Sequence, residues 1–200
     1  MFEQGGGSCG PGGKIVVHDA DRWQSNVAAL AWGAQHNIPI WPIIFQAGCK
    51  SPTLEYQADS VRYALEMSGY ASFLLAVEPN TTRPITFGTN AFWRHDTEGK
   101  PYARLHPQYH WPIGAPTETY PAEQLLAGYI LPSSDTAAIN RSAVYGRQFE
   151  NGIVVYNSGG AEVRGVRLPG GPYLDPHTNT TGGTTIDLDA QSGRVLLRHW

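Results

Sequence analysis

The stretch AVYGRQFENGIVVYN, residues 143–157, decides the fold class of the C-terminal half of the chain. Two apolar, β-rich runs flank Glu150-Asn151-Gly152, and an Asn-Gly pair between such runs is a strong local signal for a β-hairpin. Similar short runs separated by Gly-rich turns follow, and Ile and Leu alternate with Asp in residues 186–189, which predicts a half-exposed strand. We therefore expect residues 141–200 to form a small antiparallel β-sandwich.

Upstream of the hairpin, the apolar pattern has a helical period. Residues 20–37 carry one apolar stripe, which predicts a helix with Asp19 or Asp21 suited to the N-cap; the stripe is Trp23, Val27, Leu30, Ala31 and Ala34. A second helix is expected from Ser51-Pro52 to about Ala76, and its end is apolar on all sides and so buried. A short apolar run follows each helix: IPIWPIIF at residues 38–45 follows the first, and PITFG follows the second. In IPIWPIIF, two prolines restrict strand pairing to residues 43–46. This alternation predicts an α/β segment with a parallel sheet.

Composition and charge limit the classes of partner that the sequence predicts. The formal net charge is −3 and no Lys-rich or Arg-rich run occurs, so the sequence has no electrostatic footprint for nucleic acid. No apolar run reaches the roughly 18 residues of a membrane span. Triplets that begin at Asn80, Asn140 and Asn179 match the N-glycosylation acceptor pattern and favour a secreted or cell-surface protein, although residues 1–13 do not read as a signal peptide.

Motifs for metals, cofactors and other hydrolases are not apparent. Cys9 and Cys49 are too few for a disulfide framework and fit either one bridge or two free thiols. His106 and His110 are four residues apart, but the neighbouring prolines argue against a helix that would place them on one face. The one Gly-x-Ser-x-Gly match, residues 6–10, lies in GGGSCGPGG, whose glycines and proline read as a flexible loop, so we expect no nucleophile elbow there; this stretch also lacks the P-loop lysine pattern. We therefore expect no metal site and no cofactor.

Five motifs together resemble the C-terminal part of a known enzyme family: MFEQ, YALEMSGYASFLLA followed by ITFG, HPQYHWPIGAP, YGRQFENGIVVYN and GRVLLR. The family is the hypothetical glycosyl hydrolase family fifteen, whose members combine a (β/α)8 barrel with a terminal β-sandwich. The resemblance implies that residues 1–3 are the end of the sixth barrel strand. It also implies that WPIIFQAG is the seventh strand and PITFG the eighth.

This resemblance implies a division of the chain into three parts. Residues 1–115 would hold the last two to three βα units of a partial barrel, residues 116–140 a linker, and residues 141–200 the sandwich. A complete barrel needs about 200 to 250 residues, so we expect the remaining strands on a missing N-terminal segment or on another chain.

Barrel enzymes carry their active groups at the carboxyl ends of the strands. The resemblance places Glu3 there as the candidate catalytic carboxylate, with the second carboxyl group that glycoside cleavage requires on an earlier strand. Candidate substrate-binding residues lie on the same rim or in the aromatic stretch after the eighth strand, where rings can pack on sugars and polar groups can bind hydroxyls: Gln46, Asn90, Trp93, Arg94, His106, Tyr109 and Trp111. A connector that pins the sandwich to the barrel explains the same rings equally well.

The sequence therefore predicts the C-terminal portion of a glycoside hydrolase that acts on a poly- or oligosaccharide. Two alternatives stay open: a non-catalytic carbohydrate-binding or structural β-sandwich module, and a partner-binding β-domain with no role in sugar chemistry.

Overall fold

A computed structural model describes four long stretches of the 200-residue chain, residues 19–38, 59–78, 110–131 and 144–198, and five strands of two or three residues outside them. Side chains are described within the four long stretches, except for residues 59–66 and Gly182.

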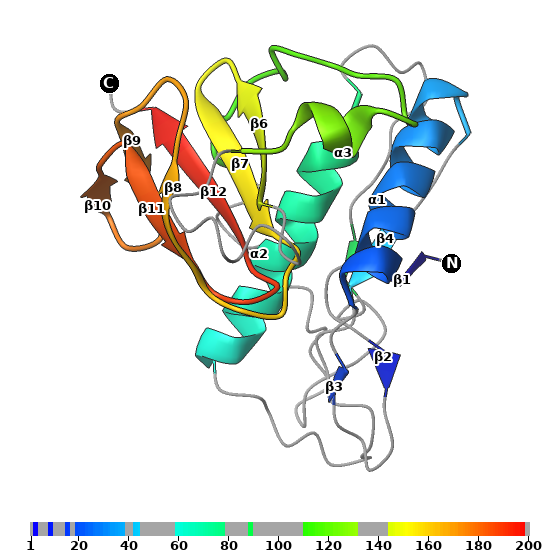
Figure 1. Cartoon of the computed structure of the whole chain (residues 1–200), viewed down its shortest axis with the longest axis horizontal. Coiled ribbons are helices and arrows are strands. Elements are labelled where there is room, and N and C mark those ends of the chain that lie inside the picture. Colours follow the sequence, from blue (N-terminus) through cyan, green and yellow to red (C-terminus); the bar gives the residue numbers. More distant parts are fainter. Residues whose placement is uncertain are drawn as a thin grey trace.

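The N-terminal part contains parallel strands that alternate with helices (Figure 1). Strands β1 (Phe2–Glu3), β4 (Pro42–Ile44) and β5 (Gly88–Thr89) pair in parallel and in chain order. Helix α1 (Ala20–Gln35) connects β1 to β4, α2 (Asp59–Ala76) connects β4 to β5, and the two helices pack against each other. The predicted alternation and parallel pairing are confirmed, although the described residues form no closed barrel.

Both helices follow their sequence signals. The Asp19 carboxylate accepts a hydrogen bond from the Arg22 backbone N–H at 2.8 Å, so Asp19 is the N-cap of α1, as predicted. The buried face of α1 contains the predicted stripe together with Gly33. Residues 67–76 of α2 are all buried, as their all-round apolar character indicated. The predicted start of this helix at Ser51 lies outside the described residues.

The C-terminal part is the predicted antiparallel β-structure. Its strands are β6 (Val144–Phe149), β7 (Gly152–Asn157), β8 (Val163–Arg167), β9 (Tyr173–Asp175), β10 (Thr180–Gly182), β11 (Thr185–Leu188) and β12 (Gly193–Arg198). Five of them form a sheet in the order β10-β9-β12-β7-β6, while β8 and β11 pair separately. In β11, Leu188 is buried and Asp187 is exposed, which confirms the predicted half-exposed strand.

The turn of the hairpin at 150–152 is not formed by the Asn-Gly pair that the sequence indicated. Phe149 pairs with Gly152, so Glu150 and Asn151 form the two-residue loop and the glycine opens β7. A Cβ atom on Gly152 would lie only 2.4 Å from the Leu196 carbonyl oxygen. The glycine is therefore required where β12 approaches β7.

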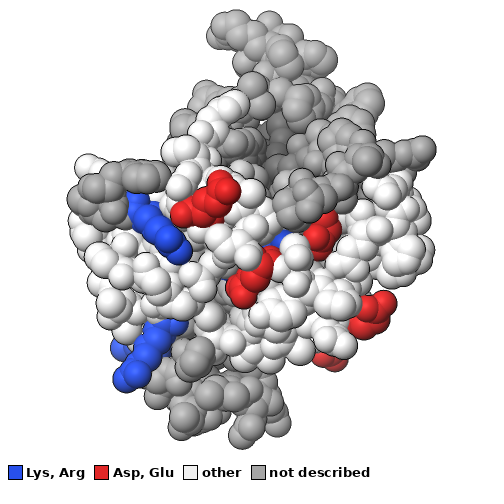
Figure 2. Space-filling model, turned by 90° about the horizontal axis from the view of Figure 1, so that it is seen from above, with Lys and Arg blue, Asp and Glu red and all other residues white. Residues whose placement is uncertain are grey.

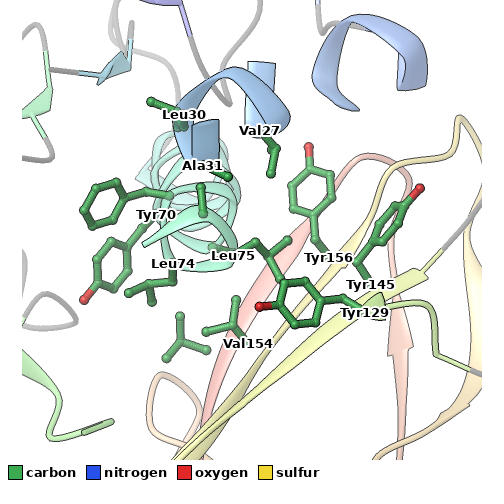
Figure 3. Packing of buried hydrophobic residues seen from close by; sticks show 14 of the residues in the cluster. Val27, Leu30, Ala31, Tyr70, Leu74, Leu75, Tyr129, Tyr145, Val154 and Tyr156 are labelled. Carbon is green, nitrogen blue, oxygen red and sulfur yellow. The ribbon is translucent and has the colours of Figure 1, made fainter. Parts of the chain in front are cut away.

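The five-stranded sheet is covered on both faces, so the C-terminal half forms three layers with the helices. Along β7, Val154 and Tyr156 belong to the core shared with α1 and α2 (Figure 3). Ile153 and Val155 belong to a second core shared with β8 and β11. A strand buried on both faces reads as a continuous apolar run, which explains the sequence IVVY.

The outer edge of β6 is covered by the segments that precede it. Asn151 N–H donates to the Ile113 carbonyl at 2.9 Å and Thr117 N–H donates to the Gln148 carbonyl at 3.0 Å. Further along the same edge, Gly146 N–H donates to the Tyr129 carbonyl at 2.7 Å, just after the short helix α3 (Leu125–Gly128). Residues 116–131 of the predicted linker thus pack on the sheet, and the domain boundaries themselves stay a prediction.

Candidate functional site

The best candidate for a functional site is the edge at which the three parallel strands end. Glu3 is the last residue of β1 and is in register with Ile43 of β4, which in turn is in register with Gly88 of β5. Neighbouring strands are about 4.8 Å apart, so the Glu3 backbone lies about 10 Å from that of Gly88. The carboxyl ends of parallel strands meet at one edge of a sheet, and the backbone places Glu3 at that edge.

A small hairpin follows Glu3 along the chain. Strands β2 (Ser8–Cys9) and β3 (Ile15–Val16) pair antiparallel between β1 and α1, with Cys9 opposite Ile15. The glycines and proline of this stretch favour a loop, so these strands were not expected. The hairpin begins five residues after Glu3 in the chain.

The residues predicted to bind substrate are mostly not described. Gln46, Asn90, Trp93, Arg94, His106 and Tyr109 lie outside the described residues, and of Glu3 only the backbone is described. Their predicted roles, and the catalytic role of Glu3, stay predictions.

Trp111 is the one predicted substrate-binding residue whose side chain is described. It is half-buried and packs against the core that α1 and α2 share with the sheet. The neighbouring Ile113 is buried in that core, and the Pro112 carbonyl accepts a hydrogen bond from the Asn151 side chain at 3.0 Å. The end of the aromatic stretch thus joins the sheet, in agreement with the connector role for Trp111.

A buried arginine that the sequence analysis did not single out lies at the other end of α2. Arg147 of β6 is fully buried, and its Nη1 donates to the carbonyls of Leu74, Leu75 and Val77 at the C-terminus of the helix. Its Nε donates to the Glu118 carbonyl at 3.2 Å. A cation at this end of a helix satisfies unpaired carbonyls and opposes the helix dipole.

The surroundings of Arg147 are aromatic and acidic. Its guanidinium carbon lies 5.3 Å from the ring centroid of Tyr129 and 5.7 Å from that of Phe149. Burial lowers the pKa of Arg147, whereas Tyr129 and the carboxylates of Glu78 and Glu118 raise it. Burial also raises the pKa of the Tyr129 hydroxyl.

Arg147 has a structural role. In a β-α-β unit the helix runs antiparallel to its strands, so the C-terminus of α2 lies toward the amino ends of the strands, opposite Glu3. The four hydrogen bonds of Arg147 join β6 to the end of α2 and to the segment at Glu118.

A cluster of three rings joins α1 to the sheet and is also structural. Trp23 stacks on Tyr156 with centroids 4.3 Å apart and an interplanar angle of 1°, and it lies 5.1 Å from Tyr145. The indole N–H donates to the Ser72 hydroxyl of α2 at 2.8 Å. Trp23 is 4% exposed and Tyr156 2%, so these rings offer no face to a ligand. Burial raises the pKa of both tyrosines.

Figure 2 shows the face of the molecule seen from above, on which a few basic and acidic side chains are scattered among uncharged ones. The described residues on this face form no continuous basic patch. Within the described residues, no helix is both long enough and apolar enough to cross a membrane.

Comparison with known proteins adds no assignment. No family model, no curated protein and no solved structure matches this chain.

Proposed function

We propose that this chain is the C-terminal portion of a glycoside hydrolase that acts on a poly- or oligosaccharide. The observation that carries the proposal is the position of Glu3, at the carboxyl end of the first of three parallel strands. Active groups in (β/α) barrels lie at this end of the strands. The sequence resemblance supplies the reaction class.

The order of the elements supports a barrel in particular. Consecutive strands are neighbours in the sheet, and the helices that connect them pack against each other. In a barrel, each strand likewise pairs with the next one in the chain and the helices form one outer layer. We propose that the remaining barrel strands are contributed by a missing N-terminal segment or by another chain.

The proposed chemistry assigns one carboxyl group to this chain. Glycoside cleavage uses a pair of carboxyl groups, one as the acid and the other as the nucleophile or base. Glu3 is proposed as one member of the pair and an earlier strand as the source of the other. The aromatic stretch after β5 is proposed as the sugar-binding rim, with Trp111 anchoring that rim to the core.

A non-catalytic structural module is the second candidate, and one observation favours it. Both faces of the five-stranded sheet at β6, β7 and β12 are buried, one by α1 and α2 and the other by β8 and β11. Those faces therefore bind no sugar, and this part of the chain acts as a support.

The test compares Glu3→Gln with a matched control in the full-length gene product. Glu162 is exposed on the sandwich and pairs with Arg164, so Glu162→Gln makes the same chemical change far from the strand ends. Turnover of a panel of oligosaccharides and their binding, measured by titration calorimetry, are recorded for both variants. We expect Glu3→Gln to lower kcat by about 100-fold or more, since a carboxyl acid or base contributes about 100- to 10,000-fold. Binding should persist in both variants.

The outcomes separate the candidates. Binding without turnover, unchanged by Glu3→Gln, indicates the non-catalytic module. Turnover that Glu3→Gln leaves intact removes Glu3 from the chemistry, and the absence of both binding and turnover contradicts the carbohydrate proposal itself.

A further inference from the structure

The turn between β9 and β10 presents an exposed asparagine that begins an acceptor triplet. Asn179 is the last residue of the turn at 176–179, directly before β10. Its φ angle of 54° lies in the left-handed region, which asparagine tolerates better than most residues. Its side chain is exposed.

This part of the chain contributes nothing to the interior. From His177 to Thr185 every residue whose exposure is described is exposed, and neither hydrophobic core contains any of them. Strand β10 lies at the end of the five-stranded order and pairs with β9. A large group attached here would therefore displace no packed side chain.

The motif around Asn179 is the acceptor triplet Asn-Thr-Thr. The other described asparagines, Asn26, Asn37, Asn151 and Asn157, do not begin such a triplet. Asn157 shows the contrast: it is fully buried, and its amide donates to the carbonyls of Ala161 and Asp189 at 2.8 and 2.9 Å.

We propose that Asn179 is an acceptor for an N-linked glycan and that the folded protein presents it to the transferase. The donor class is an oligosaccharide attached to a lipid pyrophosphate. The Asn179 amide nitrogen forms a bond to the anomeric carbon of the sugar, the bond from that carbon to the pyrophosphate oxygen breaks, and the lipid pyrophosphate leaves with the electron pair. The amide loses one proton. This modification is independent of the proposed hydrolase function.

Within the triplet, Thr181 is the residue whose hydroxyl the transferase would recognise. The hydroxyls of Thr178 and Thr180 lie 2.6 Å apart and bond to each other. Thr181 supplies the hydroxyl at the third position of the triplet and is exposed. Strand β10 has only three residues and no core contact, so it can separate locally from β9 at low cost when the transferase binds.

The test uses the folded chain, a purified oligosaccharyltransferase and its lipid-linked oligosaccharide. Peptide mapping by mass spectrometry should find one oligosaccharide on the peptide that contains Asn179, separately from any at the triplets of Asn80 and Asn140. Asn179→Gln should abolish modification at this position. Thr181→Val keeps the shape and removes the hydroxyl, so it should also abolish modification, whereas Thr180→Val at the middle position should leave it intact.

Asn37→Gln is the matched control for the turn, since Asn37 is exposed and also has a φ of 54° but begins no triplet. It should leave the modification unchanged. Circular dichroism of each variant establishes that it is folded. The proposal is overturned if the folded wild-type protein gains no sugar on Asn179 or if Thr181→Val is modified as efficiently as the wild type.

Discussion

The two faces of the five-stranded sheet are packed in different ways. The face toward β8 and β11 is almost entirely aliphatic, with Tyr173 its one aromatic residue. The face toward α1 and α2 contains tryptophan and several tyrosines, and polar groups cross it: Ser68, Ser72 and Arg147 are all buried there. Hydrogen bonds therefore link the helices to the sheet, while the other layer is held mainly by apolar contact and, at the end of β7, by the buried Asn157 amide, which donates to the Asp189 carbonyl.

This difference teaches how a helical layer is held in one orientation on a sheet. Apolar contacts are non-directional, so by themselves they allow a helix to slide or rotate. Ser68 accepts from Gly193 N–H at 3.3 Å, and Arg147 binds the carbonyls at the end of α2. These contacts define where α2 lies along β12 and where it ends. Three predictions test this comparison.

The largest effect is expected for Arg147→Met. The substitution keeps an apolar stem but leaves the carbonyls of α2 and Glu118 without their donor, so we expect a loss of about 4 kcal/mol in the free energy of unfolding, measured by chemical denaturation. Arg147→Lys keeps the charge and should lose less. Unchanged or increased stability in Arg147→Met would show that the helix side depends on apolar packing as the strand side does.

A smaller effect is expected for Gly193→Ala, which probes how closely α2 approaches β12. A Cβ atom on Gly193 would lie 2.5 Å from the Ala71 Cβ, so the helix must move and the unfolding free energy should fall by about 2 kcal/mol.

Gly160→Ala is the control, because its Cβ would meet nothing within 4 Å and stability should be unchanged. The double variant with Ala71→Gly should lose less than the sum of the two single variants. Additive losses would mean that the two positions do not touch.

The smallest effect is expected from the bond between Trp23 and Ser72. A double-mutant cycle of Trp23→Phe and Ser72→Ala should give a coupling energy of about 1 kcal/mol, because either change alone removes the buried hydrogen bond that the two side chains share. Thermal and denaturant unfolding of the four proteins measures it. A coupling near zero would leave aromatic stacking as the main contribution at this point.

Local signals predicted the elements, and contacts between residues far apart in the sequence determined how they assemble. The apolar stripe of α1 and its cap at Asp19, one of two candidates, depend on neighbours within a few residues and were found, whereas the hairpin was found with Glu150-Asn151 as its turn in place of the Asn-Gly pair. The position of β12 between β7 and β9 has no such signal. The strands β2, β3 and β10 are two or three residues long and were not predicted, since so short a run has no measurable period.

The candidate site was predictable only in part. The position of Glu3 at a strand end was implied only by the family resemblance, and the backbone agrees with it. Arg147 was missed, although a lone arginine in the apolar strand YGRQF is a usable signal. Its partners on α2 precede it by about 70 residues, so no local pattern reveals them.

The contact of α2 with β12 has a consequence for synthesis on the ribosome. The buried part of α2 ends at Ala76, but the strand that covers it begins at Gly193, more than a hundred residues later. While those residues are being translated, the part of α2 that packs on β12 stays uncovered and is open to chaperones or to aggregation. The helical layer can reach its final packing only after β12 has left the exit tunnel.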